Sequence, residues 1–480
     1  MADDADDSTR STEATREDLD SFLRGWEMLR EVASLQLGDG SNELQVRIAE
    51  HLGTDPMELE SATESLTISE LANHQLAIDA LDPNAELIGF DPNIGRHDDV
   101  SLKALASNTG RMRYGPATQP PTWVEYPIDV DEQMRCVVAG VWLVKLDAEP
   151  VVVGAWRSEG RSPVPTLRIE VIANDLDTSR QTLRRLAELR AEHNVYRGKV
   201  LGFSFTQYGE FGLEFIAPTK VTRDELILPE DDLVAIENHA IAISQRAAEL
   251  TKSGRHLKRG LLLYGPPGTG KTHTVSYLVN AMPERTTIIL QGPSAGAIGQ
   301  AAAIARSLPP ATIVIEDVDL VAYERGMGMG IGSNSLLFQL LNEMDGFDDD
   351  SDLLFVLTTN RAEVLEPALA ARPGRIDQAI EIAKPDADAR RRLLELYLEG
   401  TDHSIASLDS VIDRLEGVTA SFVKELVRRA MMSALDGDGT IGESNLDGAI
   451  TDLLEGSAQI AQSALGVGDP PMDGPPHGDW

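Results

Sequence analysis

The chain is 480 residues long, enough for about three domains of roughly 100 to 200 residues each. Hydrophobic residues make up 42% of it and charged residues 25%, as in an ordinary soluble globular protein. The 78 acidic and 42 basic residues leave a formal net charge of -36, which repels nucleic-acid phosphates and anionic lipid. We therefore expect neither a nucleic-acid nor a membrane partner.

The chain carries one cysteine, Cys136, which excludes an internal disulfide framework and a four-cysteine zinc site. Asp-rich residues follow Met1, where a secretion signal would need basic and then apolar residues. The most apolar region, residues 137–156, is interrupted by three charged side chains and is not expected to cross a bilayer. These features predict a soluble, cytoplasmic protein.

The first half of the chain carries no catalytic motif. Residues 1–20 are acidic with almost nothing apolar, so we expect disorder. Apolar residues at helical spacing predict a helical N-terminal module over 21–115, which is too acidic for a DNA-reading role to be favoured. After a Pro-rich linker, β-like runs and an arginine-bearing helix at 179–193 predict an α+β domain over 116–222. The arginine face either binds a partner or faces solvent.

A glycine-rich loop follows the apolar run 261–264, which is predicted to be a buried strand, and precedes a helix-compatible segment at 273–280. This order is the context of a phosphate-binding loop, because the loop N–H groups and the helix N-terminus favour phosphate. Lys271 is expected to reach the β- and γ-phosphate oxygens of ATP, and the Thr272 hydroxyl to ligate Mg²⁺. The expected nucleotide-binding residues are Gly265, Pro266, Pro267, Gly268, Thr269, Gly270, Lys271 and Thr272.

Two acidic residues end a second predicted strand, Ala311–Ile315. Carboxylates at the C-terminal edge of a strand beside a phosphate loop suit metal-assisted hydrolysis. We expect Glu316 to hold Mg²⁺ together with Thr272, and Asp317 to activate the attacking water.

Further polar residues follow a third predicted strand, 353–357. The Asn360 amide is expected to lie between the carboxylates' water and the γ-phosphate. Two arginines three residues apart, Arg372 and Arg375, are suited to stabilising charge on a transferring phosphoryl group.

Together these motifs resemble the ATPase module of the AAA family, over about residues 228–454. The matching segments are Gly265–Thr272 (Walker A), Ile313–Asp319 (Walker B), Leu336–Phe347, and the block from Thr358 to Asp377 (second region of homology). The resemblance implies an α/β fold with a doubly wound parallel sheet at 223–385 and a helical lid at 386–456. It also implies rings, usually of six subunits, in which Asn360 is the first sensor and Arg372 and Arg375 reach the neighbour's γ-phosphate.

Three features depart from the family pattern. The acid pair reads Glu-Asp instead of Asp-Glu, an order that resembles the mitochondrial Rieske-protein translocase and shortens the expected base by one methylene. One extra residue stands between Leu369 and Arg372, which loosens the assignment of both arginines. Residues 290–292 read Leu-Gln-Gly where protein-threading members place an aromatic–apolar–Gly triplet. The methionine-rich loop 326–332 either contacts a partner or serves as a mobile linker.

We therefore expect an ATP- and Mg²⁺-dependent, ring-forming AAA ATPase, chaperone-like and hexameric. It would remodel or assemble a protein partner without aromatic threading and recognise that partner through residues 21–222. One alternative is an ATP-gated scaffold or switch with little turnover; another is a DNA-associated protein of the wider superfamily. The Pro/Gly-rich end, 457–480, is expected to be disordered, with Trp480 as a candidate docking residue.

Overall fold

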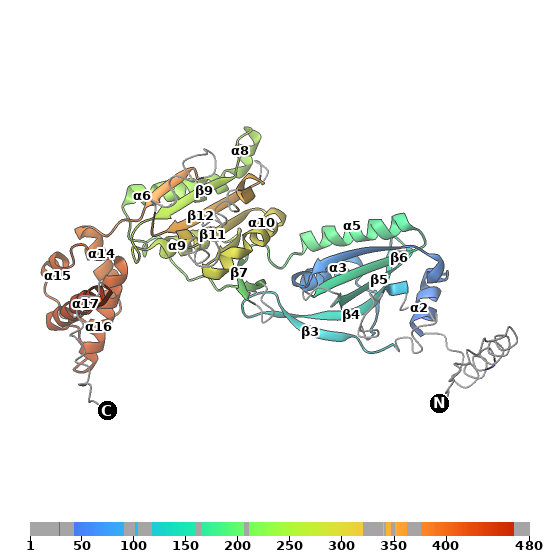
Figure 1. Cartoon of the computed structure of the whole chain (residues 1–480), viewed down its shortest axis with the longest axis horizontal. Coiled ribbons are helices and arrows are strands. Elements are labelled where there is room, and N and C mark those ends of the chain that lie inside the picture. Colours follow the sequence, from blue (N-terminus) through green and yellow to red (C-terminus); the bar gives the residue numbers. More distant parts are fainter. Residues whose placement is uncertain are drawn as a thin grey trace, which may run out of the picture. The chain divides into compact units, whose positions relative to one another are not determined.

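The computed structural model divides the chain into two compact units (Figure 1). The first comprises residues 1–126 and 133–193, and the second comprises residues 127–132 and 194–480. The structure describes residues 28, 43–90, 101–103, 118–158, 165–205, 211–319, 339, 342–346, 351–361 and 376–464.

A six-stranded sheet forms the centre of the first unit, in the order β1-β6-β5-β4-β2, with β3 paired to β4. The pairs along this path are antiparallel. The strands are β1 (Ser61–Thr67), β2 (Glu86–Ile88), β3 (Thr122–Pro127), β4 (Gln133–Leu146), β5 (Glu149–Ser158) and β6 (Thr166–Ala173). The helices are α2 (Glu43–Leu52), α3 (Leu71–Leu81) and α5 (Leu176–Glu192), with short 3₁₀ turns at Pro56–Glu58 and Ile68–Glu70.

Helices cover both faces of this sheet. Val141 and Trp142 are neighbours in β4, so their side chains point to opposite faces. Val141 shares a core cluster with Leu44 and Ile48 of α2. Trp142 instead meets the ring of His74, from α3, edge-on with a centroid separation of 6.3 Å. The α2 and α3 helices therefore lie on opposite faces, which explains why the central strands are almost continuously apolar.

The expected helical module over 21–115 is wrong as a separate domain. The β1 strand pairs with β6 and the β2 strand with β4, so both belong to the same sheet as the predicted α+β domain. The strand Ser61–Thr67 was not predicted because its apolar pattern is weak. It lies at the sheet edge, where only Ala62 is buried. Cys136 is a free cysteine buried in this sheet.

The second unit is built on a seven-stranded sheet in the order β13-β9-β12-β11-β10-β7-β8. All pairs are parallel except β7–β8. The strands are β7 (Val200–Phe205), β8 (Phe211–Phe215), β9 (Arg259–Tyr264), β10 (Thr286–Leu290), β11 (Ala311–Ile315), β12 (Leu353–Thr359) and β13 (Gln378–Glu381). The helices are α6 (Glu230–Glu237), α7 (Ile243–Gln245), α8 (Ala247–Lys252), α9 (Lys271–Ala281) and α10 (Ile298–Ser307), with a π-helical turn η3 (Asn238–Ala242) and a 3₁₀ helix η4 (Gly292–Ala297).

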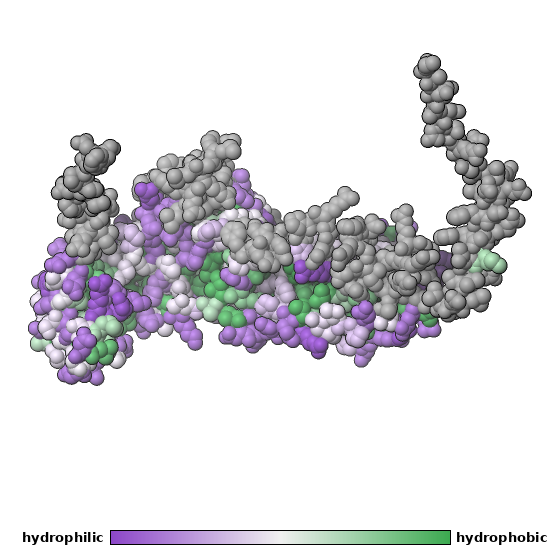
Figure 2. All heavy atoms as spheres, turned by 60° about the horizontal axis from the view of Figure 1, so that its bottom comes forward, coloured by the Kyte–Doolittle hydropathy of each residue, from purple (hydrophilic) through white to green (hydrophobic). Residues whose placement is uncertain are grey.

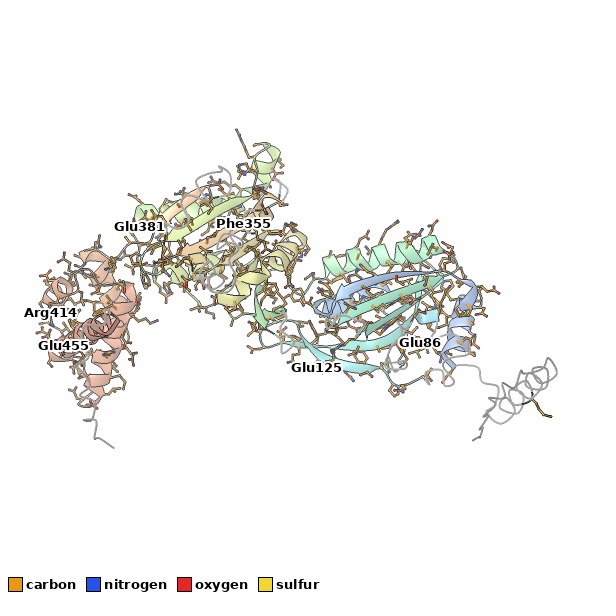
Figure 3. All side chains as sticks on the ribbon, viewed as in Figure 1. Glu86, Glu125, Phe355, Glu381, Arg414 and Glu455 are labelled. Carbon is orange, nitrogen blue, oxygen red and sulfur yellow. The ribbon has the colours of Figure 1, made fainter. Side chains whose placement is uncertain are left out.

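Two hydrophobic clusters sandwich this sheet, and this confirms the predicted doubly wound α/β fold. On one face, residues of α10 pack with Ile313 and Phe355. On the other, residues of α6 and α9 pack with Val314 and Val356, the next residues along the same strands. Phe355 is fully buried in the central strand β12, where Figure 3 labels it. The β7 and β8 strands lie within residues 116–222, predicted above to form the α+β domain, but they extend this sheet beside β10 instead.

A helical lid follows β13, as predicted. It consists of α14 (Ala387–Leu398), α15 (Asp409–Arg414), α16 (Ala420–Leu435) and α17 (Glu443–Ala464). Asp386 caps α14, its carboxylate accepting a 2.8 Å hydrogen bond from the Ala389 N–H. Because α17 continues to Ala464, the disorder expected from residue 457 onward is wrong for its first residues, and Trp480 lies outside the described part.

Hydrophilic residues dominate the visible face of the lid in Figure 2, with apolar residues scattered among them. None of the described helices has both the length and the apolar character that crossing a bilayer requires.

A buried histidine in the first unit predicts a measurable acid sensitivity. His74 is 2% exposed, and neither ring nitrogen has a hydrogen-bond partner within the described residues. Burial, reinforced by the charge of Arg190, lowers the pKa of His74 from its ordinary 6.5 to about 3. The unfolded chain therefore takes up a proton at this residue below pH 6.5 while the folded unit does not.

The stability of the first unit should therefore fall as pH falls below 6.5, by about 1.4 kcal/mol per pH unit from His74 alone. Between pH 6.5 and 5, a His74→Phe variant should lose about 2 kcal/mol less stability than the wild type. Urea titrations followed by tryptophan fluorescence measure this, because Trp142 lies against His74. The exposed His193→Gln serves as the control; equal pH slopes for wild type and His74→Phe would contradict the prediction.

Candidate active site

The predicted site residues meet at one edge of the second sheet. The β9, β11 and β12 strands are parallel neighbours, with β12 in the middle. Their C-terminal ends lead into the glycine loop, the acid pair and Asn360, respectively. The outer end of such strands is where open α/β sheets bind ligands.

The glycine loop has a conformation that only glycine adopts without strain at three positions. Gly265, Gly268 and Gly270 have φ values of +146°, +79° and +115°. A Cβ atom on Gly265 would collide with the carbonyl oxygen of Ile382, and one on Gly268 with the hydroxyl of Ser421 from the lid. The loop therefore presents its backbone at the start of α9, whose N-terminus favours anions. The Ser421 N–H also donates a 3.0 Å hydrogen bond to the Gly268 carbonyl, linking lid and loop.

Lys271 is held inside this loop. It is 6% exposed, and its Nζ donates to the carbonyl oxygens of Gly265 and Pro266, at 2.8 and 2.9 Å, and to Asn360 Oδ1 at 2.7 Å. Burial lowers the pKa of Lys271, while the carboxylates of Asp317 and Asp319 oppose this and favour its charged form. All three hydrogen-bond acceptors are neutral, so anionic phosphate oxygens can replace them with a gain in electrostatic energy.

Glu316 presents an unpartnered oxygen to the site. The side chain is 7% exposed; its Oε2 accepts a hydrogen bond from Gln291 Nε2, whereas Oε1 has no hydrogen-bond partner in the described part of the chain. Burial raises the pKa of Glu316, opposed by the side chains of Thr272 and Gln291, and the negative charge of Asp317 adds to the increase. Burying a carboxylate oxygen without a hydrogen-bond partner costs free energy. A cation bound next to this oxygen would offset that cost.

The donors near Glu316 fit Mg²⁺. Glu316 and Thr272 offer hard oxygen atoms, and Mg²⁺ is usually bound by one or two carboxylates together with substrate phosphates and water. Among the described residues there is no group of three or more His, Cys, Asp or Glu side chains arranged to hold a metal without such a substrate.

Asn360 connects the lysine to the second acid. Its Nδ2 donates a 3.0 Å hydrogen bond to Asp317 Oδ1, while its Oδ1 accepts from Lys271. Asp317 has a φ of +48°, uncommon outside glycine, and its backbone N–H donates to Thr358 Oγ1 at 3.0 Å. Backbone strain of this kind concentrates at functional sites. Lys271, Asn360 and Asp317 thus form one hydrogen-bonded row along the strand ends.

Two predicted features lie outside the described residues, namely the arginine pair Arg372 and Arg375 and the methionine-rich loop 326–332. The structure does describe residues 290–292. Leu290 is fully buried at the end of β10, and the loop continues as η4 with Ala297 and Ile298 packed in the core.

Sequence reasoning missed three polar residues at this edge, namely Gln291, Asp319 and Thr358. Gln291 binds Glu316, Thr358 binds the Asp317 backbone, and Asp319 binds the Asn360 backbone at 3.2 Å. One signal was available: each is polar and lies at, or just after, the end of an apolar strand at this edge.

Comparison with protein families identifies this domain. Residues 261–384 match the model of the ATPase family associated with various cellular activities (AAA). The chain carries an AAA domain. The matched residues run from β9 to the segment after β13 and so include the whole row of site residues. The resemblance stated from the motifs is confirmed for this part of the chain.

Similar proteins align over the same region. The ATP-dependent zinc metalloprotease FtsH of Cutibacterium acnes is 34% identical over 226 residues, which is 44% of this chain and 31% of that protein. FtsH of Mycoplasmopsis synoviae is 33% identical over 227 residues, 44% of this chain and 34% of that protein. The proteasome-activating nucleotidase of Methanococcus maripaludis is 35% identical over 188 residues, 37% of this chain and 46% of that protein. The chain thus spans between 31% and 46% of the length of these relatives.

Proposed function

We propose that the chain is an ATP- and Mg²⁺-dependent ATPase that assembles through its AAA domain into a ring, hexameric as in the family, and remodels or assembles a protein partner. The observation that carries the proposal is the row Lys271–Asn360–Asp317 beside the unpartnered oxygen of Glu316. This row places a cation, an amide, a candidate base and a metal ligand around one glycine loop.

In the proposed reaction the loop N–H groups and Lys271 bind the β- and γ-phosphates. Glu316 and Thr272 hold Mg²⁺, which neutralises charge on the phosphate oxygens when bound. Asp317 accepts a proton from the attacking water, and Asn360 orients that water and the γ-phosphate. Asn360 suits this role because its amide oxygen becomes free when Lys271 breaks its hydrogen bond to Asn360 and binds phosphate instead.

The ring completes the site in this proposal. Arg372 and Arg375 reach the γ-phosphate bound to the neighbouring subunit and stabilise the charge that develops on it. Hydrolysis then depends on assembly. The relatives' names, a protease and an activator of the proteasome, support a protein as the target.

The proposed mode of action does not thread polypeptide past aromatic rings. The loop after β10 carries no aromatic residue, and it is anchored at both ends, by the Gln291–Glu316 hydrogen bond and by the buried Ile298. We assign partner recognition to residues 21–222, most of whose described part forms a unit of its own. We place the protein in the cytoplasm, without a nucleic-acid or membrane partner, from its strongly acidic composition.

One observation favours a second candidate, an ATP-gated scaffold with little turnover. The proposed base is Asp317, one methylene shorter than Glu, and the Asn360 amide already occupies one of its oxygens. A displacement of about 1 Å at a reacting group can cost on the order of 100-fold in rate. ATP would then drive assembly without being consumed rapidly.

The specific ATPase rate measured against protein concentration, with Mg²⁺, tests the proposal. We expect the rate per subunit to rise steeply with concentration, because neighbouring arginines complete each site. An Arg375→Ala variant should bind ATP as the wild type does but hydrolyse it on the order of 10³-fold more slowly, as when a trans arginine is lost. A rate near background at every concentration, together with ATP-dependent assembly, would favour the scaffold instead.

A further inference from the structure

A buried carboxylate stands behind the row of site residues. Asp319 is 6% exposed and lies just after the acid pair. Its Oδ1 accepts two hydrogen bonds, one from Thr359 Oγ1 at 2.8 Å and one from the Asn360 backbone N–H at 3.2 Å. Both donors lie at the end of the neighbouring strand β12. A buried carboxylate with charge-assisted bonds to one short segment fixes that segment firmly.

The ends of β11 and β12 are therefore joined in both directions. Thr358 Oγ1 accepts from the Asp317 N–H, while Asp319 accepts from Thr359 and Asn360. The two strands are in register up to Ile315 and Leu357, and these side-chain bonds continue the contact beyond the last paired residues. The join also spans Asp317, the residue whose φ is +48°.

Asn360 is consequently held at three points from three segments. Its backbone N–H binds Asp319, its amide nitrogen donates to Asp317, and its amide oxygen accepts from Lys271. In the proposed reaction, the latter two side chains change partners when ATP and water enter. The bond to Asp319 is the one that does not involve a reacting group.

We propose that Asp319 is a positioning residue for hydrolysis, which holds the Asn360 backbone so that its amide stays aimed at Asp317 and the γ-phosphate while Lys271 moves to phosphate. The inference rests on the ATPase function proposed above. It assigns Asp319 no contact with ATP. Residues behind the reacting groups commonly contribute on the order of 10- to 100-fold to activity.

Two substitutions separate positioning from a general structural role. Asp319→Ala removes both accepted bonds, whereas Asp319→Asn keeps one oxygen acceptor and replaces the second oxygen by an uncharged amide nitrogen. With Asp319→Ala we expect kcat to fall by about 10- to 100-fold while the dissociation constant for ATP changes less than about threefold. Asp319→Asn should recover most of the lost kcat.

A third substitution tests the same contact independently, in case the Asp319→Ala protein does not fold. Thr359→Val removes one of the two donors at nearly constant volume and should lower kcat several-fold with unchanged ATP affinity. Combined with Asp319→Ala it should add little further loss, since both act through one contact. Asp386→Ala, which removes the carboxylate cap of α14 on the lid, is the control and should leave kcat unchanged.

The measurements are steady-state ATPase rates at ring-forming concentration and equilibrium titration with a fluorescent ATP analogue, using the full-length chain. A kcat within threefold of wild type for both Asp319→Ala and Thr359→Val would overturn the inference. So would a parallel loss of kcat and ATP affinity, or an Asp319→Asn variant as slow as Asp319→Ala. A wild type without turnover would remove the proposed function and this inference with it, whereas an active wild type with fully active variants removes the inference alone.

Discussion

A Lys271→Ala protein is expected to lose ATP binding. The lysine is the one cation that hydrogen-bonds within the glycine loop among the described residues, and the nearby Asp317 and Asp319 favour its charged form, opposing the burial that lowers its pKa. Removing one partner of a buried charge interaction costs about 2 to 5 kcal/mol, on the order of 30- to several-thousand-fold in affinity. Equilibrium titration with a fluorescent ATP analogue measures this directly.

The matched control for this substitution is Lys252→Ala, which removes an exposed lysine from α8 in the same unit. It should bind ATP as the wild type does. The Lys271→Ala protein should stay folded without nucleotide, with a somewhat lower thermal midpoint, because the change leaves the buried Gly265 carbonyl without its hydrogen-bond donor. Wild-type affinity in a folded Lys271→Ala protein would place the phosphate site elsewhere.

An Asp352→Ala protein should be less stable by about 3 to 5 kcal/mol. At the opposite edge of the AAA sheet, Asp352 pairs with both Arg259 and Arg285, at 2.9 and 2.8 Å. The two guanidinium side chains are only 3% and 2% exposed, and burial lowers the pKa of each, an effect that Asp352 opposes. Without the carboxylate, two like charges remain buried in one place.

Hydrogen–deuterium exchange of the β9 and β12 peptides, followed by mass spectrometry, measures this loss where it occurs. The described tryptophans all lie in the first unit, so their fluorescence does not report on the AAA sheet. The control is Asp409→Ala, which breaks an exposed ion pair with Arg391 and should change stability by no more than about 1 kcal/mol. Unchanged protection in Asp352→Ala would show that solvent reaches the two arginines.

The AAA fold was predictable because its central strands have a strong sequence pattern. Residues 261–264, 311–315 and 353–357 are uninterrupted apolar runs, as strands buried on both faces must be. The order of the domains was harder to predict. Edge strands such as β1 bury little and carry a weak pattern, and the sheet that β7 joins depends on a pairing with β10, some 90 residues further along the chain.

The site was predictable to the extent that its residues follow strands. Lys271, Glu316, Asp317 and Asn360 were all expected, and they do lie at one edge. Gln291 and Asp319 were not, because their importance depends on which side chain each one touches across the sheet. Spacing along one strand does not contain that information.

The β7 strand gives the proposed function a candidate route for mechanical load into the AAA domain. It follows the first unit after a connection of only residues 193–199 and lies parallel to β10. Under the proposed function, a force transmitted along β7 would load the hydrogen bonds of the parallel β7–β10 pair in shear. The force then passes to β10, whose next residue is Gln291, the partner of Glu316. Under the proposed function, tension on a bound partner would reach the proposed metal ligand Glu316 by way of β7 and β10.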